Sequence, residues 1–175
     1  MSEKNIQLEQ DNNEESMSIL SRTFITGFVG GLIGSLFGII MYYFNFSEVS
    51  PKSYVLRAWT TLEWTEGWLG DLVSIFLVGI ISIAVAFIYY GILKKINSMW
   101  MGVAYGGILW GILFIVLQPI FTNVPPVMDL DINTIVSTLC LFIIYGTFIG
   151  YSISYDYHDM KLKEKKQEQQ QANGN

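Results

Sequence analysis

Few residues of this 175-residue chain have the types and spacing that chemistry requires. The single histidine, His158, stands between Asp156 and Asp159, a pattern that could bind a metal ion or transfer protons. A metal site needs three or four ligands, and no second histidine and no cysteine stands near this one. We therefore interpret these residues as polar groups at the end of an apolar segment.

Three carboxylates form a second candidate site. Asp129 and Asp131 lie in a proline-containing segment, and Asp71 could join them to bind a cation. Hard cations prefer such oxygen ligands, but two carboxylates with no further ligand nearby make a weak pattern. We expect solvated loop residues here, and the sequence predicts no metal site and no cofactor.

The other polar candidates lie inside apolar segments. Cys140 is the only cysteine, and a thiol in a nonpolar environment is expected to be unreactive. Gln118 is the most polar residue within these segments. The common catalytic and nucleotide-binding motifs are absent from the sequence. We predict no catalytic residue and expect a protein that is not an enzyme.

Composition explains why reactive residues are scarce. Hydrophobic residues make up 51% of the chain and charged residues only 14%, and the mean hydropathy is +0.40. A soluble domain usually carries about a quarter charged residues. The sequence therefore predicts an integral membrane protein, with the lipid bilayer as its surroundings and no nucleic-acid partner.

Four apolar segments are long enough to cross a hydrocarbon core of about 30 Å as helices. None of them contains Asp, Glu, Lys or Arg, because Asp71 and Asp156 are placed just outside their ends. Pro119 is expected to kink or end the third segment. The sequence predicts an all-α, polytopic four-helix bundle that forms one transmembrane domain over residues 24–155. Its predicted spans are residues 24–46, 72–93, 100–121 and 134–155.

The distribution of positive charge predicts the orientation. Eight of the ten lysines and arginines lie before the first span, between the second and third spans, or after the fourth. The other two, Lys52 and Arg57, lie between the first and second spans. Since cytoplasmic loops are enriched in Lys and Arg, we expect both termini in the cytoplasm of a cell-membrane protein. Residues 1–23 are predicted to form a disordered acidic tail, and residues 156–175 a second tail.

Glycines recur at four-residue spacing within the spans. Positions four apart lie above one another on a helix, and small residues let helices approach closely in lipid. We expect these glycines to pack the bundle together; the alternative is that some face outward and drive homo-oligomerisation. The predicted helix-packing residues are Gly27, Gly30, Gly31, Gly34, Gly38, Gly102, Gly106, Gly107, Gly111, Gly146 and Gly150.

The connection between the first two spans has the pattern of an amphipathic helix. Ser50 and Pro51 are typical of a helix start, and Gly67 is typical of a helix end. Apolar residues between them recur at three- and four-residue spacing. We expect an extracellular helix over residues 50–66, lying on the outer surface or capping the bundle, whose acids could instead line a mouth. The predicted interfacial aromatic residues are Trp59, Trp64, Trp68 and Trp100.

Several of these features together resemble one family. They are the run from Met101 to Gly111, the pairs Gln118-Pro119 and Pro125-Pro126, the glycines of the first span and the tryptophan-rich segment 59–68. Over about residues 22–157 the chain resembles the YqhR family of conserved membrane proteins from endospore-forming Gram-positive bacteria. The resemblance implies a bacterial cell-membrane protein with several spans, and it implies no activity.

The missing chemistry, the glycine spacing and the short loops favour a non-enzymatic accessory or interaction subunit. The alternative is a small homo-oligomeric channel or passive carrier, for which the glycine rows and Gln118 provide the argument. A membrane enzyme is the third hypothesis. The expected partners are therefore a membrane protein or further copies of the same chain.

Overall fold

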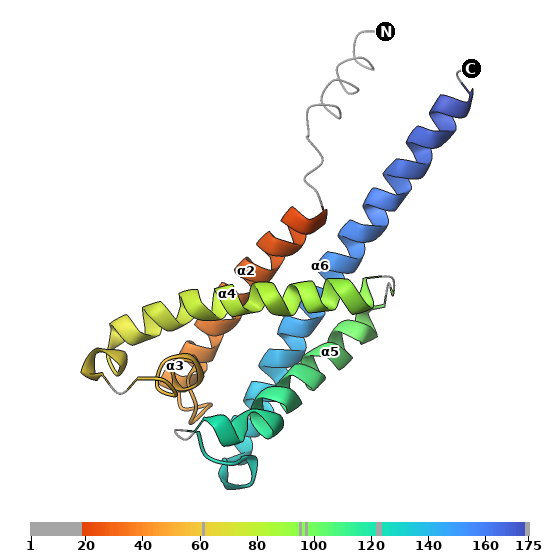
Figure 1. Cartoon of the computed structure of the whole chain (residues 1–175). Coiled ribbons are helices and arrows are strands. Elements are labelled where there is room, and N and C mark those ends of the chain that lie inside the picture. Colours follow the sequence, from red (N-terminus) through yellow and green to blue (C-terminus); the bar gives the residue numbers. More distant parts are fainter. Residues whose placement is uncertain (1–18, 61, 95, 97, 122–123, 174–175) are drawn as a thin grey trace.

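The computed structural model describes residues 19–60, 62–94, 96, 98–121 and 124–173 (Figure 1). These residues form helices and short connections, and no strand occurs among them, as the all-α prediction requires. The acidic tail was predicted for residues 1–23. Its residues 1–18 lie outside the described part, whereas residues 19–23 belong to the first helix and are not a disordered tail.

Three long helices within the described residues have the length and composition of membrane spans. They are α2 (Ile19–Tyr43), α4 (Trp68–Leu93) and the apolar part, Ile132–Lys163, of α6 (Ile132–Asn173). Each corresponds to one predicted span. The helix α6 continues without interruption from its apolar part into the predicted C-terminal tail.

The third predicted span is shorter than expected. Helix α5 (Met99–Gly111) continues as a π-helical turn over Ile112–Val116, and a 3-10 turn over Gln118–Ile120 follows. The wide turn is closed by the Leu117 amide, which donates to the Ile112 carbonyl at 2.8 Å. Proline has no amide hydrogen and clashes with the preceding helical turn, so the regular helix ends before Pro119. The apolar helical stretch, Trp100–Val116, is shorter than the three long helices.

The predicted amphipathic helix over residues 50–66 is wrong in length, and its position, which the sequence left open between the surface and the bundle, is inside the protein. Helix α3 starts at Pro51 as expected but ends at Val55, and a separate 3-10 turn covers Glu63–Thr65. Gly67 does not end a helix; it is the N-cap of α4. A surface helix buries one face, whereas consecutive side chains of this segment from Lys52 to Tyr54 are all buried. The segment dips into the protein because it packs against both α2 and α4.

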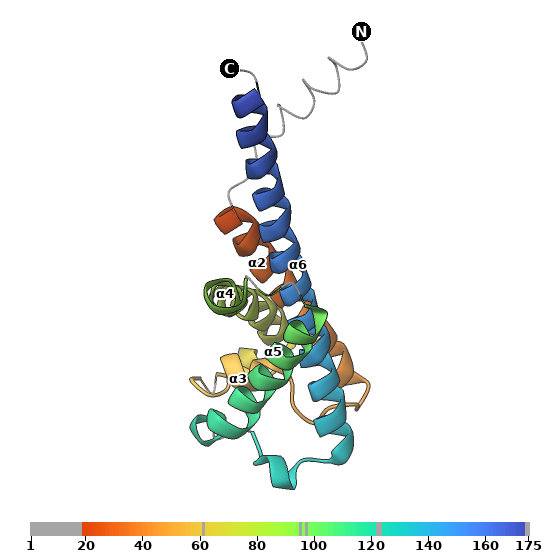
Figure 2. The same ribbon diagram turned by 90° about the vertical axis from the view of Figure 1, so that its right-hand side faces the viewer.

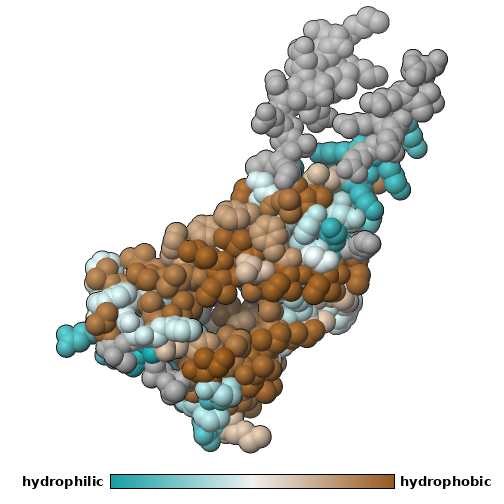
Figure 3. Space-filling model, viewed as in Figure 1, coloured by the Kyte–Doolittle hydropathy of each residue, from teal (hydrophilic) through white to brown (hydrophobic). Residues whose placement is uncertain are grey.

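The helices cross one another rather than running parallel. Helix α2 packs against α4 and α6, and α5 lies along α6. In both ribbon views α4 crosses α6 steeply, and the start of α2 lies at the same end of the molecule as the C-terminal part of α6 (Figures 1 and 2). On the face seen in Figure 3, apolar residues cover most of the helical body, and hydrophilic residues gather mainly at its edges. This distribution fits a chain surrounded by lipid.

Two clusters of buried apolar residues hold the helices together. One joins α4, α5 and α6 through Ala86, Tyr89, Tyr105, Ile149 and Ile153. The other lies at the opposite end and packs the α3 region against the end of α5 through an aromatic group. In that group the Tyr54 ring packs edge-on against two other rings. Its centroid lies 5.5 Å from that of Phe114 and 5.1 Å from that of Phe121.

Candidate functional site

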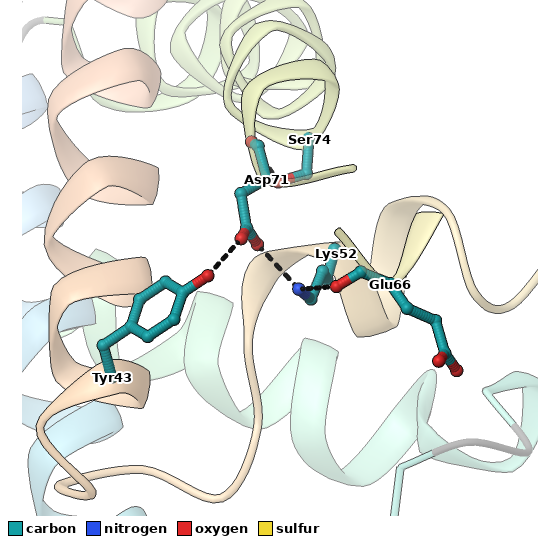
Figure 4. A network of polar contacts seen from close by, with 5 residues as sticks. All are labelled: Tyr43, Lys52, Glu66, Asp71 and Ser74. Carbon is teal, nitrogen blue, oxygen red and sulfur yellow. Dashed lines mark hydrogen bonds and ion pairs between the residues drawn. The ribbon is translucent and has the colours of Figure 1, made fainter. Parts of the chain in front are cut away.

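A buried ion pair lies where α2, α3 and α4 meet (Figure 4). The ammonium nitrogen of Lys52 in α3 is 3.1 Å from Oδ1 of Asp71 in α4, and the two side chains are only 7% and 10% exposed. Neither residue was predicted to be buried. The pair places opposite charges in a nonpolar region, where each compensates the other.

Further polar groups complete the surroundings of this pair. The Tyr43 hydroxyl at the end of α2 donates to Oδ2 of Asp71 at 2.8 Å. The Lys52 ammonium donates to the Glu66 backbone carbonyl at 3.0 Å, and the Ser74 hydroxyl donates to the Asp71 backbone carbonyl at 2.8 Å. The network therefore connects α2, α3, α4 and the turn that precedes α4.

The local sequence explains why Asp71 points into this site. Gly70 packs so closely on the Thr65 backbone that a Cβ atom would overlap the Thr65 carbonyl. This contact folds the 3-10 turn back against the start of α4. Asp71 then stands in the first helical turn, where the helix dipole favours a carboxylate.

The position of Asp71 corrects one sequence inference. The predicted span starts at residue 72, whereas α4 starts at Trp68, so the helix with the properties of a span includes the ionisable Asp71 that the prediction placed just outside it. The signal was present in Gly67, which is a common residue type just before a helix and which puts Asp71 in the first turn. The pairing with Lys52 could not be predicted, because it depends on how α3 folds.

A second ion pair joins the other end of α2 to α6. The Arg22 guanidinium lies 3.1 Å from Oδ1 of Asp156 in α6, and both side chains are partly exposed. The acids that flank His158 thus have basic partners, because Asp159 pairs with Lys163 at 3.4 Å. No group of three or more potential metal ligands occurs among the described residues.

The glycines of α2 lie on two faces that meet different helices. A Cβ atom on Gly27 would come within 2.7 Å of the Ala86 Cβ, and Gly31 lies equally tightly against Ser82. The Ser82 hydroxyl donates to the Gly27 carbonyl at 2.6 Å, a hydrogen bond that such close approach permits. The other row consists of Gly30, Gly34 and Gly38. Gly30 and Gly34 face α6, and Gly38 faces both the start of α3 and α6.

The glycines of α5 divide into a covered pair and an uncovered pair. A Cβ atom on Gly102 would lie 2.8 Å from the Thr147 Cα, and Gly106 meets the backbone of α6 equally closely. On α6, Gly146 and Gly150 supply the opposing small surface. By contrast, a Cβ atom on either Gly107 or Gly111 would meet nothing within 4 Å among the described residues. Packing within the chain was predicted for these two as well, and the structure does not place them in it.

The remaining candidates occupy separate places. Asp129 and Asp131 are exposed and do not approach Asp71; the Asp131 carboxylate accepts the Asn133 amide hydrogen at 3.3 Å at the start of α6. The Gln118 side chain donates to the Val124 carbonyl at 3.1 Å, which stabilises the loop after α5. Cys140 is exposed. The four predicted interfacial tryptophans are also exposed, and their depth in a bilayer stays a prediction: Trp59, Trp64, Trp68 and Trp100.

Comparison with known proteins gives two matches. The family described as "Conserved membrane protein YqhR" matches residues 3–169, which extends the resemblance into both tails. The protein named "Uncharacterized protein YqhR" from Bacillus subtilis (strain 168) is 41% identical over 166 residues, covering 93% of each chain. No solved structure matches the chain.

Proposed function

Because this chain belongs to the YqhR family of conserved membrane proteins, we propose that it is a multi-pass protein of the bacterial cell membrane that serves as a non-enzymatic accessory subunit. In this role it binds another membrane protein by helix packing. The proposal treats the four helices α2, α4, α5 and α6 as crossing the bilayer, with α5 as the shortest.

The observation that carries this proposal is how the charges of two ion pairs are used, one of them buried and the other partly exposed. Lys52 and Asp71 compensate each other between α3 and α4, and Arg22 and Asp156 join α2 to α6. Each of these groups could take part in proton or ion chemistry, yet each one joins two helices. Charges that are paired between helices in this way are consistent with a structural role.

The spacing of the two ion pairs supports a transmembrane arrangement. Arg22 and Tyr43 mark the two polar ends of α2 and are separated along the helix by about 31 Å, at a rise of 1.5 Å per residue. This distance is close to the roughly 30 Å thickness of a hydrocarbon core. The excess of Lys and Arg at the end that holds Arg22 favours cytoplasmic termini.

The uncovered glycines of α5 provide the most direct way to test the proposal. Small residues let helices approach closely in lipid, and a Cβ atom on Gly107 or Gly111 would meet no other segment of the described chain within 4 Å. The experiment is a C-terminally tagged pull-down from native membranes after brief crosslinking, carried out with the natural chain and with Gly107→Leu. Gly91→Leu is the matched control, because a Cβ atom on Gly91 in α4 also meets nothing within 4 Å.

A stoichiometric second protein that is lost in Gly107→Leu and retained in Gly91→Leu would support the accessory role. If the natural chain crosslinked only to itself, the accessory role would be wrong and a homo-oligomer would replace it. Flux measured in liposomes containing only this protein would then decide between a passive oligomer and the channel or carrier alternative.

A further inference from the structure

Three elements meet at the end of the molecule that also holds the Arg22–Asp156 pair. Helix α4 ends there, α5 begins there, and α6 passes beside both (Figure 1). The Ser154 hydroxyl on α6 donates to the Ile96 carbonyl at 3.3 Å, which holds the connection between α4 and α5 against α6. Side chains from the connection and from α6 therefore share one small region.

The ammonium groups of two lysines in this region lie near the same aromatic ring. The Lys94 ammonium lies 5.6 Å from the centroid of the Tyr157 ring, and the Lys161 ammonium lies 5.2 Å from the same centroid. Lys94 also lies over the Tyr90 ring at 4.1 Å. The tyrosines attract each ammonium through the electrons of their rings but supply no negative charge. The region therefore collects positive charge.

The nearby carboxylates that the structure describes pair with other basic groups. The nearby acids Asp156 and Asp159 pair with Arg22 and Lys163 respectively. Among the described side chains, which do not include those of residues 164, 166–168 and 170–173, neither Lys94 nor Lys161 forms an ion pair with an Asp or Glu. Two like charges held near one ring repel each other, and an anion between them would remove that repulsion.

The start of α5 adds to the positive potential. Its N-cap, Ser98, is extended and makes no hydrogen bond from its side chain to the first helical turn. The Met101 amide donates to the Ser98 carbonyl at 3.1 Å, the two amides before it have no acceptor within the helix, and the helix dipole is positive at this end. This contribution is secondary, since the two lysines define the site.

Exposed apolar side chains flank the lysines. Trp100 is 80% exposed at the start of α5, and Ile92 is 72% exposed near the end of α4. Tryptophan favours the headgroup level of a bilayer, whereas an exposed isoleucine favours acyl chains. A ligand that fits all these groups has a phosphate and an apolar tail.

We propose that Lys94 and Lys161, assisted by the start of α5, bind the phosphate of an anionic phospholipid such as phosphatidylglycerol. The inference rests on the membrane location of the chain and not on its role as an accessory subunit. The lipid headgroup lies between the end of α4 and the part of α6 around Tyr157 and Lys161, and its acyl chains lie along the apolar surface beside Ile92.

The test measures lipid binding to the purified full-length chain by native mass spectrometry, with phosphatidylglycerol and phosphatidylcholine as ligands. The site variant is Lys94→Gln with Lys161→Gln. The control is Lys163→Gln with Lys165→Gln, which removes the same charge from the same end of the molecule. At about 1 kcal/mol for each lysine, we expect the site variant to bind phosphatidylglycerol roughly 30-fold more weakly. The control should bind it nearly as well as the natural chain, and phosphatidylcholine should bind weakly to all three.

Equal loss in the site variant and the control would show attraction by overall charge and would overturn the site. Unchanged binding in the site variant would overturn it as well. Titration with excess inorganic phosphate tests the nature of the ligand, and we expect phosphate alone to displace little lipid. Complete displacement at the same lysines would identify a free anion as the ligand and contradict the lipid assignment. Because no partner protein is present, these outcomes do not depend on the accessory role.

Discussion

At the scale of single residues, Lys52 and Asp71 depend on each other for their burial. Both side chains are almost completely enclosed, so neither can exchange its partner for water. Forming such a pair contributes little to stability, because removing two charges from water costs about as much as their attraction returns. Replacing only one of the two residues reduces stability much more, since the other charge then stays unpaired in a nonpolar region.

Replacement of Asp71 by Asn should destabilise the protein strongly. Lys52 would lose its compensating charge, and breaking a buried pair in this way costs about 3–5 kcal/mol. The measurement is the free energy of unfolding in mixed micelles. Lys52→Met combined with Asp71→Leu should recover most of the loss, because no charge is left buried. Lys163→Gln breaks an exposed pair and should cost about 0.5 kcal/mol or less. A loss of that small size in Asp71→Asn would contradict the burial of this pair.

Tyr54 supports a prediction about pH. Its buried hydroxyl meets no hydrogen-bond partner among the described residues, and burial raises its pKa above the ordinary value of 10.0. In the unfolded chain the group loses its proton near pH 10, whereas in the folded protein it keeps it. The unfolded state then binds fewer protons, so stability falls as the pH rises above 10.

Tyr54→Phe should remove this contribution. The variant should be as stable as the natural chain or more stable at pH 7, because it no longer buries an unpaired hydroxyl. Its unfolding free energy should also fall less between pH 9 and pH 11. The comparison is a series of unfolding curves for both proteins over that pH range. A steeper alkaline loss in the variant would mean that the folded protein stabilises the ionised hydroxyl, which would contradict its burial.

At the scale of elements, hydropathy predicted which segments are helices, because long uncharged runs in lipid must satisfy their own backbone hydrogen bonds. Pro119 predicted that the third span is kinked or ends there, and the regular helix does end before it, but the π-helical turn over Ile112–Val116 depends on local geometry and was not predicted. Hydropathy did not predict α3 either. Residues 50–66 have the spacing of an amphipathic helix, but Tyr54 packs among aromatic rings from distant segments, and these contacts outweigh the local pattern.

Glycine spacing predicted two faces of α5 but not which of them is covered. This division yields a test with two adjacent residues. Gly106→Leu forces a side chain into the backbone of α6, and overpacking of this kind costs about 1–3 kcal/mol or more. Gly107→Leu points into open space and should leave the unfolding free energy nearly unchanged. Both are measured by unfolding in the same micelles. Equal destabilisation in the two variants would show that the Gly107 face is also packed within the chain.

At the scale of the whole molecule, each end of α2 is tied to another helix by polar contacts. Arg22 contacts α6 at one end, and Tyr43 contacts α4 at the other. The candidate site could not be predicted as a unit from the sequence, because its members are separated by apolar residues and are assembled only by the crossing of the helices. The two polar ends nevertheless make the membrane orientation testable.

We predict that Glu63 faces the outside of the cell and that Lys165 faces the cytoplasm. Both side chains are exposed, and they lie on opposite sides of the apolar segments in the predicted topology. With Cys140 replaced by Ser, an impermeant maleimide added to intact cells should label Glu63→Cys. It should label Lys165→Cys only after the membrane is permeabilised. The reverse pattern would invert the topology and move both termini outside.

The uninterrupted course of α6 has a mechanical consequence. Its 42 residues correspond to a rod of about 63 Å, roughly twice the thickness of a hydrocarbon core. A continuous helix is stiff, so a torque applied at its far end is not absorbed by a joint before it reaches the membrane. Rotation of the C-terminal part of α6 would therefore rotate the surface at Gly146 and Gly150 against α5. A force on the last turns of α6 would thus change the packing between α6 and α5 inside the bilayer.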